Sequence, residues 1–361
     1  MNTPVFQPQS IWFCAEGWEA GLSEELSRKF PGRTFERLDS GVVGCKGFHP
    51  PRPGAEIFPR FFLSEAHLIE ASSHREIIRQ AGPLVDAALD HTHDRWTLHV
   101  STPGVFTLDG EHYREASARA GLLADLFLER MRTYRKRAME RFTAADAFRQ
   151  GLVAQFWVLS SQRVIVTVTR ERLARKMTLS TLFLPAASQI PADAKAPCRS
   201  YYKLEEAFLH AHRSPRPGDT CVDLGAAPGG WSWGALKRGA RVTAIDAADL
   251  AEHVASHPNC VHRRDNGFEY LPVQPVDWMF CDMIVKPLAA LGLLERWLQA
   301  QACRSFVLNI KFRGREPGSF LPDIERLQHT YELGRLKIRH LYYDRSEITL
   351  IHTHHREGDI R

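Results

Sequence analysis

Residues 220–246, TCVDLGAAPGGWSWGALKRGARVTAID, hold two apolar segments separated by a glycine-rich turn and a helical segment. The first apolar segment ends at Leu224, and the second ends on Asp246. A strand, a tight turn, a helix and a second strand in this order are typical of a parallel sheet covered by helices. In such a sheet a ligand binds at the carboxyl ends of the strands. The stretch therefore predicts an α/β fold with a ligand site at its turn.

The same alternation continues through the C-terminal half of the chain. Strand-like segments and helical segments follow one another at 249–257, 260–265, 276–283, 288–301 and 305–312. A helix is expected at 324–335, and two β-rich segments, 337–344 and 347–355, are expected to form a closing hairpin at the sheet edge.

The N-terminal half has a different pattern, which predicts an α+β region. Strands are expected at 10–16, 41–47 and 96–102 and in two runs within 152–170, with helices at 19–30, 76–89 and 115–141. The region is read as one unit or as two subdomains divided near residues 95–110. The proline-containing segment 184–200 is the expected linker. We therefore expect one domain over residues 1–185 and a second over 186–361.

Composition allows a nucleic-acid partner without requiring one, since Lys and Arg exceed Asp and Glu by only 47 to 42. None of the seven cysteines forms a C-x-x-C pair, and the N-terminus has no signal-peptide pattern. No apolar run has the length of a membrane span. These features predict a cytoplasmic protein without a membrane partner.

The turn DLGAAPGGW predicts a nucleoside site. Gly229 and Gly230 are expected to leave room for a ligand at the helix start, and Asp246 is placed to accept hydrogen bonds from ribose hydroxyls. The spacing is not the G-x-G-x-x-G of a nicotinamide dinucleotide site, and no G-K-[ST] of a phosphate-binding loop follows. S-adenosylmethionine is the ligand that suits the pattern, while a tight turn without any ligand is the alternative.

Two more acids end strand-like segments. Asp265 lies in HRRDNGF and Asp282 in MFCDM, so both are expected at the ligand-binding edge of the sheet. Asp265 is expected to face the adenine and Asp282 the methionine end of the ligand. A single strand-end acid is more often a loop cap, and it is the series behind DLGAAPGG that favours a site.

Three further residues form a set with Asp282, so that the four are Lys203 in SYYKLEEA, Asp282 in FCDM, Lys311 in LNIKF and Glu347 in RSEITL. On its own Lys203 reads as a solvated surface lysine. In this order and context, however, the four resemble the Lys-Asp-Lys-Glu tetrad of the FtsJ-type RNA 2′-O-ribose methyltransferases. The resemblance covers about residues 196–355 and is closest to the RlmM group, which modifies a cytidine of bacterial 23S ribosomal RNA.

The resemblance implies a Rossmann-like, S-adenosylmethionine-dependent methyltransferase domain preceded by a ferredoxin-like unit and a THUMP-like RNA-binding module. It implies that the methyl donor is contacted by Ser200, Ala227, Pro228, Gly229, Gly230, Asp246, Asp265 and Asp282. Ser200 is also expected to cap the helix that carries Lys203.

Methylation of a ribose hydroxyl requires alignment and a path for the departing proton. Lys311 is the candidate base or, alternatively, a group that steers the hydroxyl lone pair, while Asp282 and Glu347 are expected to hold the two ammonium groups. No metal is expected, because the histidine clusters at 91–93, 210–212 and 352–355 lack zinc-site spacing and read as surface residues.

RNA contacts are expected from the basic stretch ERMRTYRKRAMERF, with a solvated helix face as the alternative. Its basic and aromatic residues are Arg130, Arg132, Tyr134, Arg135, Lys136, Arg137, Arg141 and Phe142. Arg313 and Arg315 lie just after Lys311 and are expected to meet the RNA backbone. A methyltransferase for another RNA, a catalytically silent RNA-binding protein and, more remotely, a NAD-dependent enzyme are the competing readings. The oligomeric state has no signal in the sequence.

Overall fold

The computed structural model forms two compact units, Met1–Gln189 and Ile190–Arg361. The predicted domain boundary near residue 185 lies outside the described residues. Those residues are 9–50, 56–102, 110–144, 147–170, 190, 192–312, 320–334 and 336–354, with only the backbone of 110–117 described.

The second unit is built on a seven-stranded sheet in the order β10-β9-β8-β11-β12-β14-β13. Its strands are β8 (Thr220–Leu224), β9 (Arg241–Ile245), β10 (Cys260–Arg263), β11 (Val276–Cys281), β12 (Cys303–Lys311), β13 (Lys337–Arg339) and β14 (Glu347–His352). Strands β8 to β12 pair in parallel, and β14 runs antiparallel between β12 and β13. Its helices are α6 (Tyr201–Ala211), α7 (Gly230–Leu236), α8 (Glu252–Ala255), α9 (Pro287–Gln299) and α10 (Leu321–Thr330).

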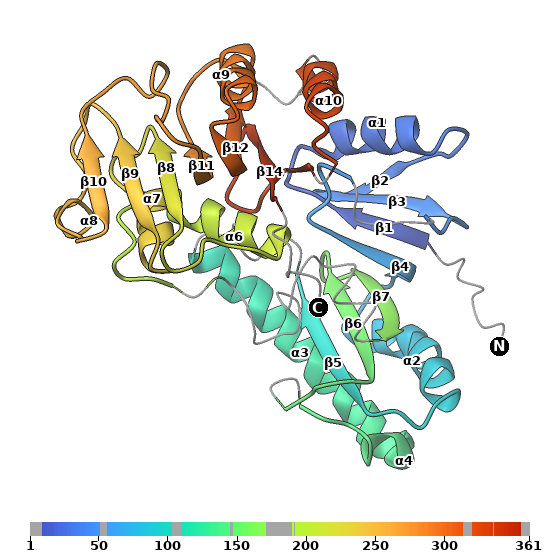
Figure 1. The fold of residues 1–361 in the computed structure, drawn as a ribbon. Coiled ribbons are helices and arrows are strands. Elements are labelled where there is room, and N and C mark those ends of the chain that lie inside the picture. The colour runs from blue at the N-terminus through green and yellow to red at the C-terminus, as the bar shows by residue number, and fades with distance from the viewer. Residues whose placement is uncertain are drawn as a thin grey trace. The chain divides into compact units, whose positions relative to one another are not determined.

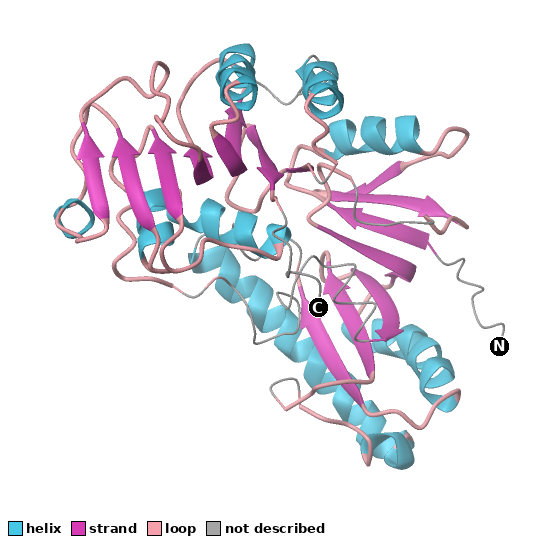
Figure 2. Ribbon diagram, viewed as in Figure 1, coloured by secondary structure: helices cyan, strands magenta, loops and turns pink. Residues whose placement is uncertain are grey.

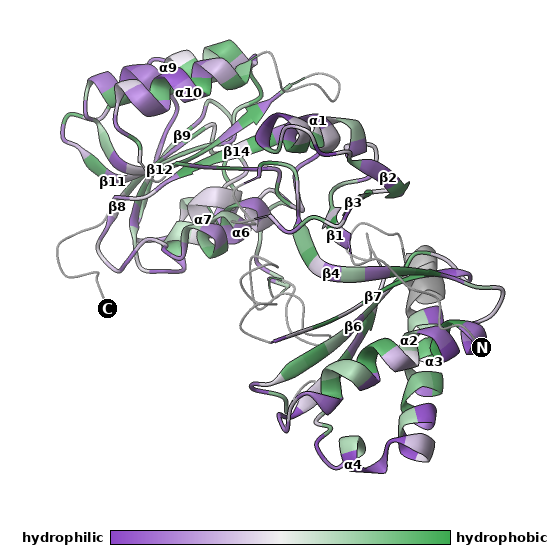
Figure 3. Ribbon diagram, turned by 90° about the vertical axis from the view of Figure 1, so that its right-hand side faces the viewer, coloured by the Kyte–Doolittle hydropathy of each residue, from purple (hydrophilic) through white to green (hydrophobic). Residues whose placement is uncertain are grey.

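Helices cover both faces of this sheet. Helices α6 and α7 lie on one face, and α9 and α10 lie on the other, as two perpendicular views show (Figures 1 and 3). The core between the sheet and α6 and α7 includes Phe208, Trp231 and Phe280, all almost completely buried. The predicted α/β fold is therefore confirmed for this unit.

The closing hairpin lies at the sheet edge as predicted, but its first strand is short. Strand β13 ends at Arg339, whereas a strand was expected up to Asp344. The chain turns instead because the Asp344 carboxylate accepts a hydrogen bond from the backbone N–H of Leu341 at 2.9 Å.

The first unit also contains a seven-stranded sheet, in the order β2-β3-β1-β4-β7-β6-β5. Its strands are β1 (Gln9–Phe13), β2 (Glu36–Asp39), β3 (Val42–Lys46), β4 (Phe61–Glu70), β5 (Trp96–Ser101), β6 (Leu152–Val158) and β7 (Arg163–Arg170). Its helices are α1 (Glu19–Lys29), α2 (His74–Asp90), α3 (Gly110–Tyr134) and α4 (Lys136–Met139). Figure 2 shows the helices and strands of both units. Strands β2 and β4 were not predicted.

Strand β4 joins the two parts of this sheet. Its residues 61–66 pair with β1, and its residues 67–70 pair with β7. Between them Glu65 has a φ of 51°, so the strand is irregular where its partner changes. The division expected near 95–110 falls between β5 and α3, which pack in the same apolar core. The sheet changes strand partners within β4, between residues 66 and 67.

The long basic helix is interrupted where the sequence predicted continuity to residue 141. Helix α3 ends at Tyr134, and Arg135 has a non-helical φ of −131° and ψ of 46° before α4 begins. Among the described helices, none is both long and apolar enough to cross a membrane.

Candidate functional site

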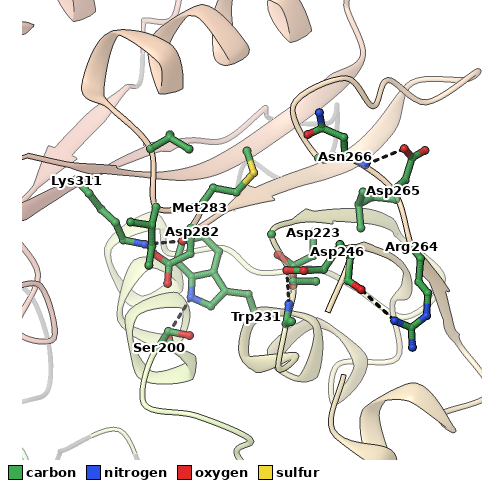
Figure 4. A pocket seen from close by; sticks show the side chains of 18 residues that line it. Ser200, Asp223, Trp231, Asp246, Arg264, Asp265, Asn266, Asp282, Met283 and Lys311 are labelled. Carbon is green, nitrogen blue, oxygen red and sulfur yellow. Dashed lines mark hydrogen bonds and ion pairs between the residues drawn. The ribbon is translucent and has the colours of Figure 1, made fainter. Parts of the chain in front are cut away.

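A cavity of about 880 Å³ opens at the carboxyl ends of the parallel strands of the second unit. Lys311 and Asp282 lie at one end, Asp265 and Arg264 at the other, and Asp223 and Asp246 between them (Figure 4). The predicted ligand edge of the sheet is therefore hollow, and six of the expected site residues line it: Ser200, Ala227, Asp246, Asp265, Asp282 and Lys311.

The glycine-rich turn is held by hydrogen bonds to the end of β9. The backbone N–H groups of Gly225 and Ala226 donate to the Ile245 carbonyl at 2.9 and 3.2 Å. Gly225 has a φ of 74°, and a Cβ there would collide with Met283 Cγ. Only glycine therefore allows this turn to approach the segment after β11.

Pro228, Gly229 and Gly230, which were also expected to contact the donor, are not among the residues that line the cavity. A Cβ on Gly229 would lie 2.9 Å from Val254 Cγ1, and one on Gly230 would lie 2.6 Å from Cys198 Sγ. These two glycines make room for the protein's own side chains. Pro228 follows a cis peptide bond.

Asp246 is fixed at the end of β9 by two backbone donors. Its carboxylate accepts hydrogen bonds from the N–H groups of Ala227 at 3.0 Å and Ala248 at 2.9 Å. Asp265, which is exposed, accepts a bond from the N–H of Asn266 at 2.7 Å. Both carboxylates retain unused acceptor capacity toward the cavity.

Ser200 lies at the helix start but does not cap it with its side chain. Its Oγ lies 3.0 Å from Cys198 Sγ, and its carbonyl accepts a hydrogen bond from Trp231 Nε1 at 2.8 Å. The residue therefore links α6 to α7 at the cavity wall.

Asp223 is a cavity residue that sequence reasoning missed. It lies within the apolar strand β8, is 1% exposed, and accepts a hydrogen bond from Ser232 Oγ at 2.7 Å. Burial raises the pKa of the Asp223 carboxyl to about 7. An acid inside an otherwise apolar strand was the available signal.

The structure brings the four tetrad residues together. Lys311 Nζ donates to Asp282 Oδ1 at 2.6 Å and to the Asp282 carbonyl at 2.5 Å, and Lys203 Nζ donates to Glu347 Oε1. Lys203 Nζ also lies 3.8 Å from Asp282 Oδ1. The pairing of β12 with β14 places Lys311 opposite Glu347, which explains why residues so distant in sequence meet.

The two lysines have different surroundings. Lys311 and Asp282 line the cavity. Lys203 is only 8% exposed, and neither Lys203 nor Glu347 lines the cavity. Lys203 is therefore no surface lysine. Burial lowers its pKa, but the carboxylates of Asp282, Asp344 and Glu347 outweigh burial and hold the pKa of Lys203 above its ordinary value.

Asp344 was also missed by the sequence analysis. Its Oδ1 lies 4.0 Å from Lys203 Nζ, and its Oδ2 accepts a hydrogen bond from Thr349 Oγ1 at 3.0 Å. Burial, and then the nearby Glu347 carboxylate, raise the pKa of Asp344 well above its ordinary value. The cluster around Lys203 thus contains a third acid.

The histidine clusters are only partly at the surface. His210 is 7% exposed with Nε2 3.7 Å from Glu206 Oε1, and burial lowers its pKa. His355 lies outside the described residues. Within the described part of the chain, no three His, Cys, Asp or Glu side chains are grouped as metal ligands.

The basic stretch that includes the end of α3 and α4 divides into two groups. Arg130 and Arg135 form ion pairs with Asp86 and Asp90 of α2, and Arg141 donates to backbone carbonyls. Arg132, Lys136 and Arg137 are exposed, and Tyr134 is 76% exposed. Phe142 packs on Trp96 with ring centroids 4.9 Å apart. Arg313 and Arg315 lie outside the described residues.

Comparison with known proteins identifies the second unit. Residues 196–321 match the FtsJ-like methyltransferase family. Proteins called ribosomal RNA large subunit methyltransferase M are similar over longer stretches. The one from Pseudomonas putida (strain GB-1) is 32% identical over 71% of this chain and 74% of its own length. The chain belongs to the ribosomal RNA large subunit methyltransferase M family.

Two further family members show the extent of the match. The Thauera aminoaromatica protein is 28% identical over 94% of both chains. The Laribacter hongkongensis protein is 36% identical over 54% of this chain, a match that spans 57% of that relative. Membership of the ribosomal RNA large subunit methyltransferase M family makes the protein an S-adenosylmethionine-dependent methyltransferase.

The cavity residues fit S-adenosylmethionine. The lining holds four carboxyl groups, of Asp223, Asp246, Asp265 and Asp282. Its two basic groups are already bonded, Lys311 to Asp282 and Arg264 to Asp249 and to the Ala247 carbonyl. An excess of hydrogen-bond acceptors suits a ligand that carries hydroxyl, amino and sulfonium groups.

The pKa of Asp223 predicts a pH dependence of stability. Folding raises the pKa of this carboxyl from 3.8 to about 7. The protonated carboxyl therefore makes its full contribution to the free energy of unfolding below about pH 4, and this contribution is lost as the pH rises toward 7. Asp223→Asn, which retains an acceptor for Ser232, should remove this dependence. The difference in unfolding free energy between the two proteins should change by at most about 1.4 kcal/mol per pH unit.

Urea unfolding of the full chain at several values between pH 4 and 8 measures this difference. Glu325→Gln, which removes an exposed carboxylate of α10, is the control and should stay parallel to the unsubstituted protein. Parallel curves for Asp223→Asn as well would contradict the assignment.

Proposed function

We propose that the protein transfers a methyl group from S-adenosylmethionine to the ribose 2′-hydroxyl of a cytidine in bacterial 23S ribosomal RNA. The observation that carries the proposal is the placement of Lys311 beside Asp282 at one end of the cavity. The family relatives, named as large-subunit ribosomal RNA methyltransferases, support the RNA class.

In this proposal different cavity residues contact different parts of the methyl donor. Asp246 accepts from the ribose hydroxyls, Asp265 faces the adenine, and Asp282 lies at the methionine end together with Ser200. Bound there, S-adenosylmethionine supplies an electrophilic methyl group on a sulfonium.

The two lysines take different roles because their surroundings differ. Lys203 is surrounded by carboxylates that keep it protonated, so it serves as a fixed cation that holds Glu347 and Asp282. Lys311 faces the cavity and can reach the hydroxyl of an incoming ribose. As a neutral amine it accepts the hydroxyl proton, and as an ammonium it orients the hydroxyl lone pair.

The charges of the tetrad are balanced when both lysines are protonated. Two ammonium groups and the carboxylates of Asp282 and Glu347 together carry no net charge. Loss of the Lys311 proton leaves one net negative charge, which offsets the positive charge of the sulfonium. Proton transfer from the ribose then restores neutrality.

We infer that the first unit, read as ferredoxin-like and THUMP-like regions, binds the RNA. Exposed Arg132, Lys136 and Arg137 flank the exposed Tyr134, which supports a surface that pairs phosphates with cations and stacks a base on the ring. Such a role places the protein in the cytoplasm, with ribosomal RNA.

The function is tested by mapping ribose methylation in a deletion strain. One cytidine of 23S ribosomal RNA should lose its 2′-O-methyl group and regain it when the unsubstituted gene is restored. A lost methyl group in another RNA would favour the alternative substrate. An unchanged methylation pattern would leave the catalytically silent RNA-binding protein as the better reading.

The role of Lys311 is tested by single-turnover methyl transfer. Lys311→Ala should bind the donor normally, because Asp246 and Asp265 remain, but should transfer the methyl group about 10²- to 10⁴-fold more slowly. Lys311→Arg should also fail as a base, since a guanidinium does not lose its proton near neutral pH. Calorimetry of donor binding is the control, and near-normal transfer by Lys311→Ala would disprove the assignment.

The exposed basic surface is tested by the salt dependence of RNA binding. Replacing Arg132, Lys136 and Arg137 with glutamine should reduce the slope of log affinity against log salt by roughly 0.7 to 0.9 for each RNA phosphate that these side chains neutralise. Arg79→Gln, an exposed arginine of α2 held by Glu76, is the control. An unchanged slope would mean that these side chains form an ordinary solvated surface and do not neutralise RNA phosphates.

A further inference from the structure

Asn309 is a buried polar residue in the middle of the apolar strand β12. It is 1% exposed and lies between Leu308 and Ile310, both fully buried. A polar side chain in such a place is retained only when its hydrogen bonds are made within the protein.

The Asn309 amide connects the two acids of the tetrad. Nδ2 donates to Asp282 Oδ1 and to Glu347 Oε2, both at 3.0 Å. The two N–H bonds thus go to two different carboxylates, one at the end of β11 and one at the start of β14. Each of these carboxylates also holds a lysine, Asp282 holding Lys311 and Glu347 holding Lys203.

Chemistry fixes the orientation of this amide. Rotation by half a turn would bring the Asn309 carbonyl oxygen against two carboxylates, which cannot donate to it. In the orientation present, Oδ1 has no hydrogen-bond partner among the described residues. A buried acceptor without a partner costs about 1–3 kcal/mol, so fold stability alone is a poor reason for an asparagine here.

We propose that Asn309 is a positioning residue of the methyl-transfer reaction, whose amide clamps Asp282 and Glu347 so that both tetrad lysines stay aligned. The inference rests on the proposed function for the reaction itself. Asn309 is not one of the four residues of the FtsJ-type tetrad.

The clamp acts on a crowded set of charges. The ionisable groups packed around it are Lys203 from α6, Asp223 from β8, Asp282 after β11, Lys311 from β12, Asp344 before β14 and Glu347 from β14. Acids outnumber cations in this set. The two N–H groups of Asn309 are neutral donors that stabilise both carboxylates without adding a third cation.

Without the Asn309 amide, the negative charges of Asp282 and Glu347 should be stabilised mainly by the two ammonium groups. Asn309→Leu keeps a similar volume and removes both donors, so Lys311 should retain its proton to a higher pH. Asn309→Asp adds a carboxylate and should move the same transition further. We expect a displacement of about one pH unit and a 10- to 100-fold slower methyl transfer near neutral pH.

The first measurement needs neither RNA nor methyl donor. An amine attacks acetic anhydride only in its neutral form, so the pH dependence of Lys311 acetylation, followed by mass spectrometry in the full chain, reports when Lys311 loses its proton. Lys311 is 22% exposed in its side chain and lines the cavity, which gives the reagent access. The transition should lie at higher pH in Asn309→Leu and Asn309→Asp than in the unsubstituted protein.

The matched control is Ser305→Ala. Ser305 is a buried polar residue of the same strand, but its Oγ accepts a hydrogen bond from the His354 N–H, remote from the tetrad. This variant should keep the acetylation profile of the unsubstituted protein. Donor binding by calorimetry should be unchanged in Ser305→Ala.

The second measurement is single-turnover methylation of unmodified 23S ribosomal RNA transcript across pH. A rise in rate displaced to higher pH in the Asn309 variants supports the clamp. Equal acetylation profiles in all four proteins, or a rate lowered equally at every pH, would overturn it. Failure of the unsubstituted protein to methylate any ribose would instead refute the proposed function, while the acetylation result would still judge the clamp.

Discussion

The structure of the second unit depends on the burial of opposite charges at one sheet edge. Two lysines and two carboxylates meet there, with Lys203 and Glu347 almost completely withdrawn from water. Charges in such a place are tolerated only when they are paired and hydrogen-bonded. The antiparallel insertion of β14 between β12 and β13 provides this pairing, because it brings Glu347 beside Lys311 and against the helix that carries Lys203.

Much of this arrangement could be predicted from the sequence. The apolar segments that end on Asp246 and Lys311, and the acid that follows β11, were sufficient to predict the α/β fold and the edge where the ligand site lies. The position of β14 within the sheet could not be predicted, since strand order depends on packing between distant segments. Asn309 and Asp344 were missed because they belong to no spaced motif, and Asp223 was missed although it is the first residue of DLGAAPGGW.

Some residues of the predicted motifs contact neighbours that the sequence did not indicate. Gly229 and Gly230 stand in the turn where a ligand was expected, yet their missing side chains make room for Val254 and Cys198. Likewise Arg130 and Arg135 contribute to a basic stretch but are neutralised by acids of α2 more than forty positions earlier in the chain. A sequence shows that a side chain is absent or charged, and only the fold shows which atoms it meets.

Strand β4 has a consequence for the mechanics of the first unit. Because residues 61–66 complete one half of the sheet and residues 67–70 the other, one continuous strand joins the two halves. Separating the halves would expose a row of unpaired backbone N–H and C=O groups on each side, which is a surface prone to association with other chains. The first unit is therefore poorly suited to being cut into smaller modules, because a cut between its halves would divide β4.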